Sequence, residues 1–213
     1  MITTKQMRKL EELSEQHGVS RARLMENAGK AAFDIIRTSF NTKSMKALVV
    51  CYHGNNGGDG FVLARHLMKE HKTDVLFLGE EKKLKEEARA AWDRLDKSKV
   101  KRSLKEASGE SGKYTAVIDA LLGTGTKGKI KEPVRSAISF INSQDATIIS
   151  LDVPSGIDPD TGESQDIAVE PSLIITFHDA KKGLKRYENR TIIADIGIPR
   201  EAIIRHLRGS PRG

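Results

Sequence analysis

The sequence predicts an α/β fold, a three-layer Rossmann-like sandwich with a mostly parallel central sheet. Two observations predict it. Short apolar runs alternate along the chain with amphipathic stretches, which is the pattern of successive βαβ units. The apolar runs, such as LIITF at 173–177, are continuous instead of alternating with polar residues, as expected for strands that helices cover on both faces.

The amphipathic stretches are expected to be helices. Met7, Leu10 and Leu13 recur at threefold spacing in the first of them. Ser20 is a suitable N-cap for the second, whose apolar positions lie on one face. The expected helices are, in chain order, residues 4–16, 20–37, 60–71, 81–106 and 132–142.

The apolar runs between these helices are expected to be buried strands of one sheet. They are residues 46–51, 74–78, 114–120, 146–153, 173–177 and 190–196. The length of 213 residues suits one domain, and no Pro/Gly/Ser linker divides it. We therefore expect a single domain over 1–207, followed by a flexible tail or linker stump at 208–213.

Positive charge is concentrated in one segment. The chain has a formal net charge of +7, and residues 81–106 hold ten Lys and Arg against six Asp and Glu. Leu84, Ala88, Ala91 and Leu95 form an apolar stripe, so we interpret the segment as an amphipathic helix with a solvated charged face. Nucleic-acid binding by this helix is the weaker alternative, because few aromatic side chains are available for base stacking.

The sequence carries no sign of membrane insertion or secretion. No run reaches the ~20 apolar residues of a membrane-spanning helix. The first sixteen residues lack the apolar core of a secretory signal, and the single cysteine, Cys51, cannot form an internal disulfide. We expect a cytoplasmic protein with no membrane partner.

Three glycine-bearing polar loops follow predicted strands. They are GNNGGDG at 54–60, DALLGTGTKGK at 119–129 and DVPSGIDPDTG at 152–162. Loops at the carboxyl ends of parallel strands meet at one edge of the sheet, where ligands bind. We therefore expect the three loops to converge on one site.

The first two loops indicate a phosphate-bearing ligand. Glycines let backbone N–H groups face an anion, and Asp59 is expected to cap a helix that begins near Gly60. Lys127 and Lys129 add positive charge to the second loop. Two such loops on one edge favour a pyrophosphate or dinucleotide. Ordinary glycine-rich turns with solvated lysines are the alternative. The spacing of the first loop is neither G-x-G-x-x-G nor that of a Walker A loop, so those mechanisms do not transfer to it.

Oxygen-bearing side chains in these loops also suit a hard cation. Asn56, Asp119 and Ser155 supply amide, carboxylate and hydroxyl oxygens at the same predicted edge. Asp152 lies at the same predicted edge, so a cation bound among these oxygens is expected.

Five motifs in fixed order resemble the YjeF N-terminal domain family. They are LMENAG (24–29), GNNGGDG (54–60), DALLGTG (119–125), DVPSGIDPDTG (152–162) and ADIGIP (194–199), and the resemblance spans about residues 5–200. It implies epimerisation of the R and S forms of hydrated NADH and NADPH, which is a step of nicotinamide nucleotide repair. It also implies a partner NAD(P)H-hydrate dehydratase and a homodimer.

The resemblance assigns residues as well as a reaction. It implies a potassium ion at Asn56, Asp119 and Ser155, and a lysine that matches Lys181. The substrate contacts that it implies are Asn55, Asn56, Gly57, Gly58, Asp59, Gly123, Thr124, Gly125, Thr126, Lys127, Gly128, Lys129 and Asp152.

The chain departs from the family pattern at two places. Tyr52 and His53 stand where the first loop usually begins with Gly-Pro, and no proline precedes the lysine in HDAKKG. The family also includes non-catalytic nucleotide-binding or scaffold domains, so that function is the alternative. Whether the chain stands alone or was cut from a fused dehydratase stays open.

Epimerisation needs a group that donates and accepts protons beside the hydrated ring. We expect Asp152 to be that group, with Lys181 orienting it or shifting its pKa. His53 and His178 are the rival acid–base residues.

Overall fold

The described part of the chain forms a seven-stranded, fully parallel sheet in the order β3-β2-β1-β4-β5-β6-β7. A computed structural model describes residues 1–109, 114–125 and 128–209. Strand order reverses between β1 and β4, which opens a crevice at the carboxyl ends of these two strands. The strands are β1 (Lys46–Cys51), β2 (Lys72–Phe77), β3 (Val100–Lys101), β4 (Ala116–Ala120), β5 (Thr147–Leu151), β6 (Leu173–Phe177) and β7 (Thr191–Ala194).

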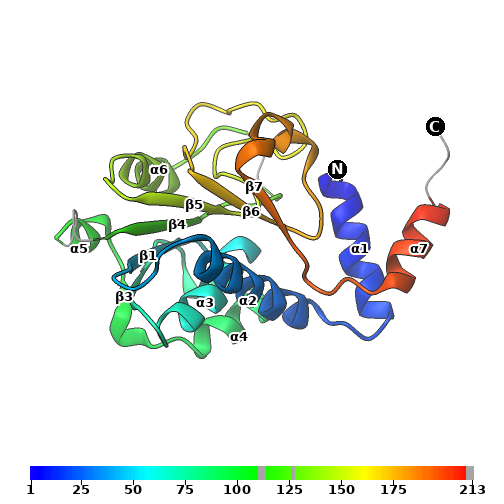
Figure 1. Cartoon of the computed structure of the whole chain (residues 1–213), viewed down its shortest axis with the longest axis horizontal. Helices are drawn as coiled ribbons and strands as arrows, with labels where there is room; N and C mark the ends of the chain where they lie inside the picture. The colour runs from blue at the N-terminus through cyan, green and yellow to red at the C-terminus, as the bar shows by residue number, and fades with distance from the viewer. Residues whose placement is uncertain (110–113, 126–127, 210–213) are drawn as a thin grey trace.

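Helices cover both faces of the sheet, as Figure 1 shows. One face carries α2 (Arg21–Ser39), α3 (Asn55–Leu67) and α4 (Glu86–Asp93), and the other carries α6 (Val134–Asn142). Two further helices, α1 (Thr4–Gln16) and α7 (Arg200–Gly209), pack against each other beyond the β7 side of the sheet (Figure 1). The remaining short elements are α5 (Leu104–Ser108) and the 3₁₀ helices at Glu81–Lys83, Lys97–Lys99 and Lys182–Arg190.

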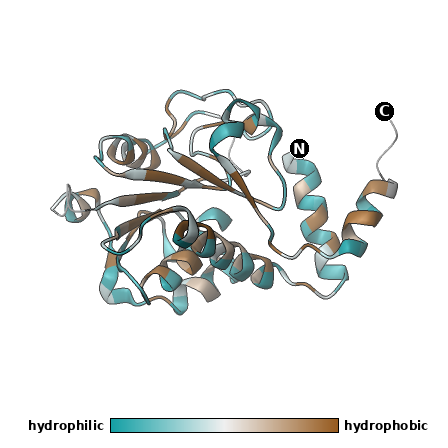
Figure 2. Ribbon diagram, in the orientation of Figure 1, coloured by the Kyte–Doolittle hydropathy of each residue, from teal (hydrophilic) through white to brown (hydrophobic). Residues whose placement is uncertain are grey.

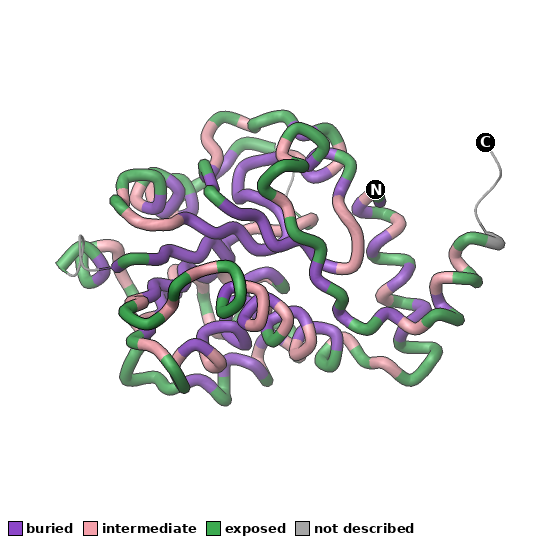
Figure 3. Tube along the Cα trace, viewed as in Figure 1, coloured by how far each residue is buried: buried purple, intermediate pink, exposed green. Residues whose placement is uncertain are grey.

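Successive residues of a strand pack into two different apolar cores, one on each face of the sheet. In β1, Ala47, Val49 and Cys51 pack toward α2 and α3, whereas Leu48 and Val50 pack toward α6. Figures 2 and 3 show the result: the strands are apolar and buried, and the helices turn polar, exposed faces outward. Burial on both faces explains why the strands read as continuous apolar runs. The predicted α/β sandwich is confirmed, and its sheet is parallel throughout.

The glycine-rich stretch is helical, which corrects the predicted start of the third helix. Helix α3 begins at Asn55, with Gly54 as its N-cap, so Asp59 lies inside the helix and does not cap it. A Cβ on Gly57 would lie 1.8 Å from the carbonyl oxygen of Tyr52, and one on Gly60 would lie 2.6 Å from the Cβ of Ala120. Close packing of this helix end overrides the low helix propensity of glycine.

The predicted helix over 81–106 is wrong in extent. Its longest α-helix is Glu86–Asp93, and the rest of the segment contains two 3₁₀ turns, β3 and the start of the short helix α5. The side chain of Asp96 accepts a hydrogen bond from the backbone N–H of Ser98, a local turn that competes with helix continuation. In the apolar stripe, Ala88, Ala91 and Leu95 are nevertheless buried, and Leu84 is partly buried. Trp92 joins it, with its ring 4.8 Å from the Phe77 ring.

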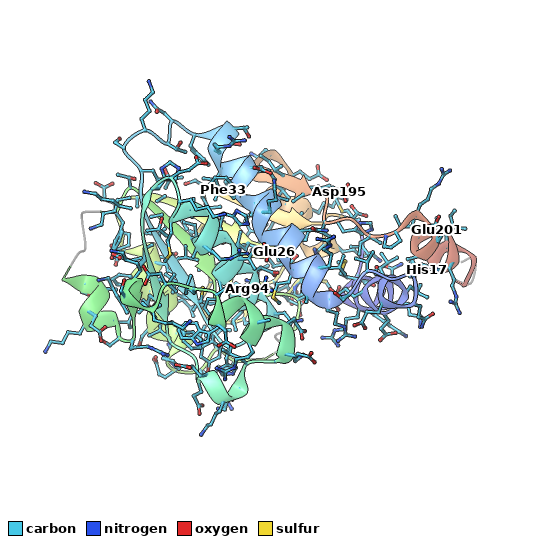
Figure 4. All side chains as sticks on the ribbon, turned by 90° about the horizontal axis from the view of Figure 1, so that it is seen from below. His17, Glu26, Phe33, Arg94, Asp195 and Glu201 are labelled. Carbon is cyan, nitrogen blue, oxygen red and sulfur yellow. The ribbon has the colours of Figure 1, made fainter. Side chains whose placement is uncertain are left out.

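Several basic residues of this segment have partners within the chain. Arg102 pairs with Glu81 and stacks on the rings of Phe77 and Trp92. Lys83 pairs with Glu80. Figure 4 shows the same region from the α2 side, where Glu26 lies beside Arg94 at an O–N distance of 3.9 Å. Much of the excess charge is therefore used in surface ion pairs, which agrees with the interpretation as a solvated face.

Helix α7 was not expected from the sequence. Its buried Ala202 belongs to the larger core, and Arg205 Nη1 donates to Gln16 Oε1 of α1 at 2.8 Å. The helix extends to Gly209, so the beginning of the expected tail is helical, and 210–213 lie outside the described residues. Among the described helices, none combines the length and apolar character needed to cross a membrane.

Gly57→Ala should destabilise the protein strongly. The added methyl group would collide with the Tyr52 carbonyl, a backbone atom that cannot rotate away, so we expect a loss of about 3 kcal/mol. Gly54→Ser is the matched control, because the space there is open and serine is a good N-cap; its effect should stay within about 0.5 kcal/mol. Urea denaturation measures both. Equal stabilities of the two variants would contradict the packing argument.

Candidate functional site

A pocket of about 680 Å³ lies at the carboxyl ends of β1, β4, β5 and β6. Loops after these strands form its base, and helices α1, α2 and α4 form its walls. Residues that follow β1 and β4 both contribute, so the pocket sits at the reversal of strand order where a parallel sheet binds its ligands. Its volume suits a small organic ligand or part of a nucleotide.

A buried ion pair forms the base of the pocket. Lys181 is 1% exposed, and its Nζ lies 2.5 Å from Oδ1 of Asp152. The same Nζ donates to the carbonyl oxygen of Phe177 at 2.9 Å and to Oγ1 of Thr176 at 3.2 Å. The ammonium group therefore has one ion-pair partner and two hydrogen-bond acceptors. Lys181 is thus held as a fixed positive charge beside Asp152.

The backbone of Asp152 adopts a conformation that is uncommon for a residue with a side chain. It follows β5 directly, has a φ of 62°, and donates its N–H to the carbonyl oxygen of Ile175 on β6 at 2.8 Å. Left-handed non-glycine residues cost free energy and persist where surrounding contacts hold them, often at functional sites. This turn directs the carboxyl group into the pocket. A Cβ on Gly123 would lie 3.4 Å from Asp152 Oδ2.

Further carboxyl groups share the pocket with Asp152. Burial raises the pKa of Asp59 well above its usual value, and the nearby charges of Asp152 and Glu11 raise it further. Burial likewise raises the pKa of Glu11, with a second contribution from Asp152. Several acids crowded around one lysine favour retention of a proton in the pocket.

A second polar cluster lies behind the base of the pocket. Both oxygens of the fully buried Asp119 accept hydrogen bonds: Oδ1 from the Ser155 hydroxyl at 2.6 Å, and Oδ2 from the Ser150 hydroxyl at 2.8 Å and the Ser155 N–H at 2.9 Å. Burial raises the pKa of Asp119, although these hydrogen bonds lower it. Asn56 donates to the carbonyl oxygen of Leu122 at 2.9 Å, and Leu122 in turn donates its N–H to Ser155 Oγ.

This cluster suits a cation that prefers neutral oxygen ligands. Asn56 Oδ1 is buried and has no hydrogen-bond partner. An unpaired buried acceptor is costly, and a cation beside it and Asp119 would remove that cost. Within the described part of the chain, no three His, Cys, Asp or Glu side chains group as metal ligands, so the donors here are amide, hydroxyl, carbonyl and carboxylate oxygens.

The structure brings together part of the predicted substrate set. The predicted residues that line the pocket are Asn55, Asn56, Asp59, Gly123, Thr124, Gly125 and Asp152. Four others do not line it: Gly57 and Gly58 pack inside the fold, and Gly128 and Lys129 are exposed. Thr126 and Lys127 lie outside the described residues.

The two rival histidines differ in position. His53 lines the pocket, whereas His178 does not. Burial lowers the pKa of both imidazoles. His53 is therefore the rival that remains within reach of a bound ligand.

Sequence reasoning missed the walls of the pocket. Helix α1 contributes Met7, Arg8, Glu11 and Glu12, and α4 contributes Glu87. Their spacing in the sequence marks only amphipathic helices. No local signal shows that α1 folds back over an edge of the sheet built by residues more than a hundred positions away.

Comparisons with known proteins agree with this geometry. The chain is 38% identical over 208 residues to the NAD(P)H-hydrate epimerase of Nitrosopumilus maritimus, covering 94% of this chain and 97% of that protein. It is 38% identical over 194 residues to the bifunctional NAD(P)H-hydrate repair enzyme Nnr of Methanopyrus kandleri, covering 87% of this chain and 38% of that protein. The chain thus spans less than half the length of that bifunctional relative.

The fold is also that of a solved structure, the yeast protein ynu0 (YNL200c). It superposes with a TM-score of 0.83 at 24% identity and covers 100% of this chain and 95% of that one. A family model described as YjeF-related protein N-terminus matches residues 21–183, a span that includes the pocket loops, the buried lysine and the cation cluster. The chain therefore belongs to the family of YjeF-related protein N-termini.

Proposed function

We propose that the chain epimerises the R and S forms of hydrated NADH and NADPH. Relatives that match it over nearly their whole length are named NAD(P)H-hydrate epimerase. The observation that carries the proposal is the buried Lys181–Asp152 pair in a pocket at the sheet edge. A proton-transfer group held by a fixed charge, beside space for a ring, suits inversion of a carbon that bears a hydroxyl group.

The reaction that we propose has two halves. A carboxylic acid gives a proton to the hydroxyl oxygen on C6 of the hydrated ring, the C6–O bond breaks, and water leaves with its electron pair. The ring nitrogen donates its lone pair to the resulting cation. Water then adds to the opposite face of C6, and its surplus proton returns to a carboxylate in the pocket. Protons and electrons balance, and only the configuration changes.

We assign roles to the pocket residues on this basis. Asp152 exchanges the proton, and Lys181 fixes the orientation of its carboxyl group through the 2.5 Å contact. Asp59 lines the same pocket, and burial raises its pKa well above the usual value, so its carboxyl group favours the protonated form more than an exposed aspartate does. The loop at Gly123–Gly125 leaves room for the ligand above Asp152.

We further propose potassium as the ion of the Asn56–Asp119–Ser155 cluster. The unpartnered Asn56 Oδ1 and the buried carboxylate support it. When bound, the ion supplies positive charge that offsets the burial of Asp119 and joins the loops after β1, β4 and β5. A large monovalent ion is a weak Lewis acid, so we give it no role in proton transfer.

Two partnerships complete the proposal. The bifunctional repair enzymes hold this domain within chains more than twice its length, which supports a dehydratase as the next enzyme in the repair. Exposed Ile204 and Leu207 on α7, beside the N-terminal helix, support a homodimer at this end of the molecule. Light scattering of the whole chain measures its molar mass in solution, and a mass of twice the chain is expected.

Asp152→Asn should lower the epimerisation rate by roughly 10²–10⁴, because the amide keeps the shape but cannot exchange a proton. Interconversion of pure R and S hydrates, followed by chromatography after subtraction of the spontaneous rate, measures it. Lys181→Ala should lose less, and His53→Ala and His178→Ala almost nothing. A near-normal rate in Asp152→Asn would reject the assignment of Asp152. An inactive His53→Ala variant would instead identify His53 as the acid–base residue.

Potassium should raise the melting temperature relative to choline at equal ionic strength, because an ion that binds only the folded state stabilises it by mass action. Asn56→Leu should abolish this difference, since it removes the amide oxygen that has no other partner. Asn41→Leu, a change in the exposed segment before β1 and therefore at the opposite edge of the sheet, should keep it. Identical melting curves of the unmodified protein in potassium and choline would argue against the ion.

A further inference from the structure

The end of the third loop has a structural role that the proposed chemistry does not use. In the segment DPDTG (158–162), the carboxylate of Asp160 accepts two hydrogen bonds from Thr4, the first residue of α1. Thr4 N donates to Oδ1 and Thr4 Oγ1 to Oδ2, both at 2.8 Å, across 156 residues of sequence. A carboxylate at this place satisfies a free N–H of the helix and complements the helix dipole.

The residues before α1 pair directly with the segment that carries the buried lysine. Ile2 forms a parallel bridge with Lys181: its N–H donates to the carbonyl oxygen of Ala180 at 2.8 Å, and its carbonyl oxygen accepts from Lys182 N–H at 3.2 Å. These two bonds hold the backbone on both sides of Lys181. Ile2 is 6% exposed, so the pairing is also packed into the core.

The DPDTG segment is itself tightly built against the same region. Asp158 Oδ1 accepts from the N–H groups of Asp160 and Thr161 at 2.8 and 2.9 Å, which fixes the turn. Gly183 N donates to the carbonyl oxygen of Pro159 at 2.9 Å. A Cβ on Gly183 would lie 2.4 Å from the carbonyl oxygen of Asp158, so the two backbones touch. Asp160 therefore stands on a rigid turn that also borders the lysine segment.

Helix α1 links this anchor to the pocket. It starts at Thr4, and its next turns place Met7, Arg8 and Glu11 in the pocket wall. Its far end is braced by α7, where Arg205 bonds Gln16, and Figure 4 shows His17 next to Glu201 of α7. Release of Thr4 would thus disturb both the wall of the pocket and the strand-like pairing at Lys181.

We propose that Asp160 is a positioning residue for Lys181, acting through Thr4 and Ile2. The carboxylate fixes the start of α1, the fixed helix keeps Ile2 paired on both sides of Lys181, and Lys181 thereby keeps its contact with Asp152. This inference rests on the proposed epimerisation only for its kinetic readout, because the backbone pairing can be measured without substrate.

The kinetic test compares four variants of the whole chain. Asp160→Ala should lower kcat for epimerisation by roughly 10- to 100-fold, the effect of a displaced catalytic group, and change KM less. Thr4→Val should show a smaller loss, and Thr4→Ser, which keeps both hydrogen bonds, should match the unmodified protein. Asp96→Ala is the control, since it removes an aspartate that caps a turn at the other end of the sheet and should leave kcat unchanged.

A double-mutant cycle separates positioning from general stability. In the Lys181→Ala background, Asp160→Ala should lower kcat by less than about twofold, because the group it positions is gone. Hydrogen exchange at the amides of Ile2 and Lys182 should become faster in Asp160→Ala and stay slow in Asp96→Ala.

Two results would overturn the inference. One is an equal loss of kcat in both backgrounds, and the other is unchanged exchange at Ile2 and Lys182 in Asp160→Ala. If the unmodified protein shows no epimerisation at all, the proposed function fails, and the exchange result alone decides whether Asp160 holds the lysine segment.

Discussion

The constraint on which the site depends is the burial of one ammonium group. A charge removed from water must be paired and fully hydrogen-bonded, or the lysine would be driven out of the fold or neutralised. Lys181 has Asp152 as its ion-pair partner and Thr176 and the Phe177 carbonyl oxygen as hydrogen-bond acceptors, and each of these partners lies at the end of β5 or β6. The strained turn at Asp152 is a consequence of the same requirement, since the carboxylate has to face the lysine directly after its strand ends.

A second constraint is the close approach of backbones beneath the pocket. Gly57, Gly60 and Gly183 each stand where a methyl group would meet another residue at 2.6 Å or less. The glycines of GNNGGDG therefore serve packing at least as much as ligand approach. Because α3 starts within this stretch, Asn56 is held on the first turn of a helix, and its amide nitrogen bonds the Leu122 carbonyl oxygen in the loop after β4.

Much of the fold could be predicted from the sequence because its strands are apolar on both faces. A continuous apolar run is a pattern that depends only on local residues. The strand ends also placed Asp152, Asp119 and Asn56 at one edge. Two kinds of feature could not be predicted. The helical start at Asn55 depends on close packing of Gly60 against the distant Ala120, which outweighs the low helix propensity of glycine, and the break near Asp96 depends on a side-chain turn that apolar spacing does not reveal. The walls formed by α1 and α4 depend on tertiary folding, and nothing in LEELSEQ or KEEARAAW marks a residue such as Glu11 as facing a ligand.

The pairing of Ile2 with Lys181 also bears on when the site comes into existence. During synthesis the first residues emerge long before β6 and the lysine segment. The pairing of Ile2 with Lys181 closes a long loop, and it forms late because few local contacts offset the entropic cost of closure. The sheet around β1, β2 and β4 can assemble earlier from nearer contacts. Until the last strands are in place, α1 has no edge to dock on and Asp152 has no lysine. The ion pair of Asp152 and Lys181 is therefore absent from every nascent chain that ends before the lysine segment.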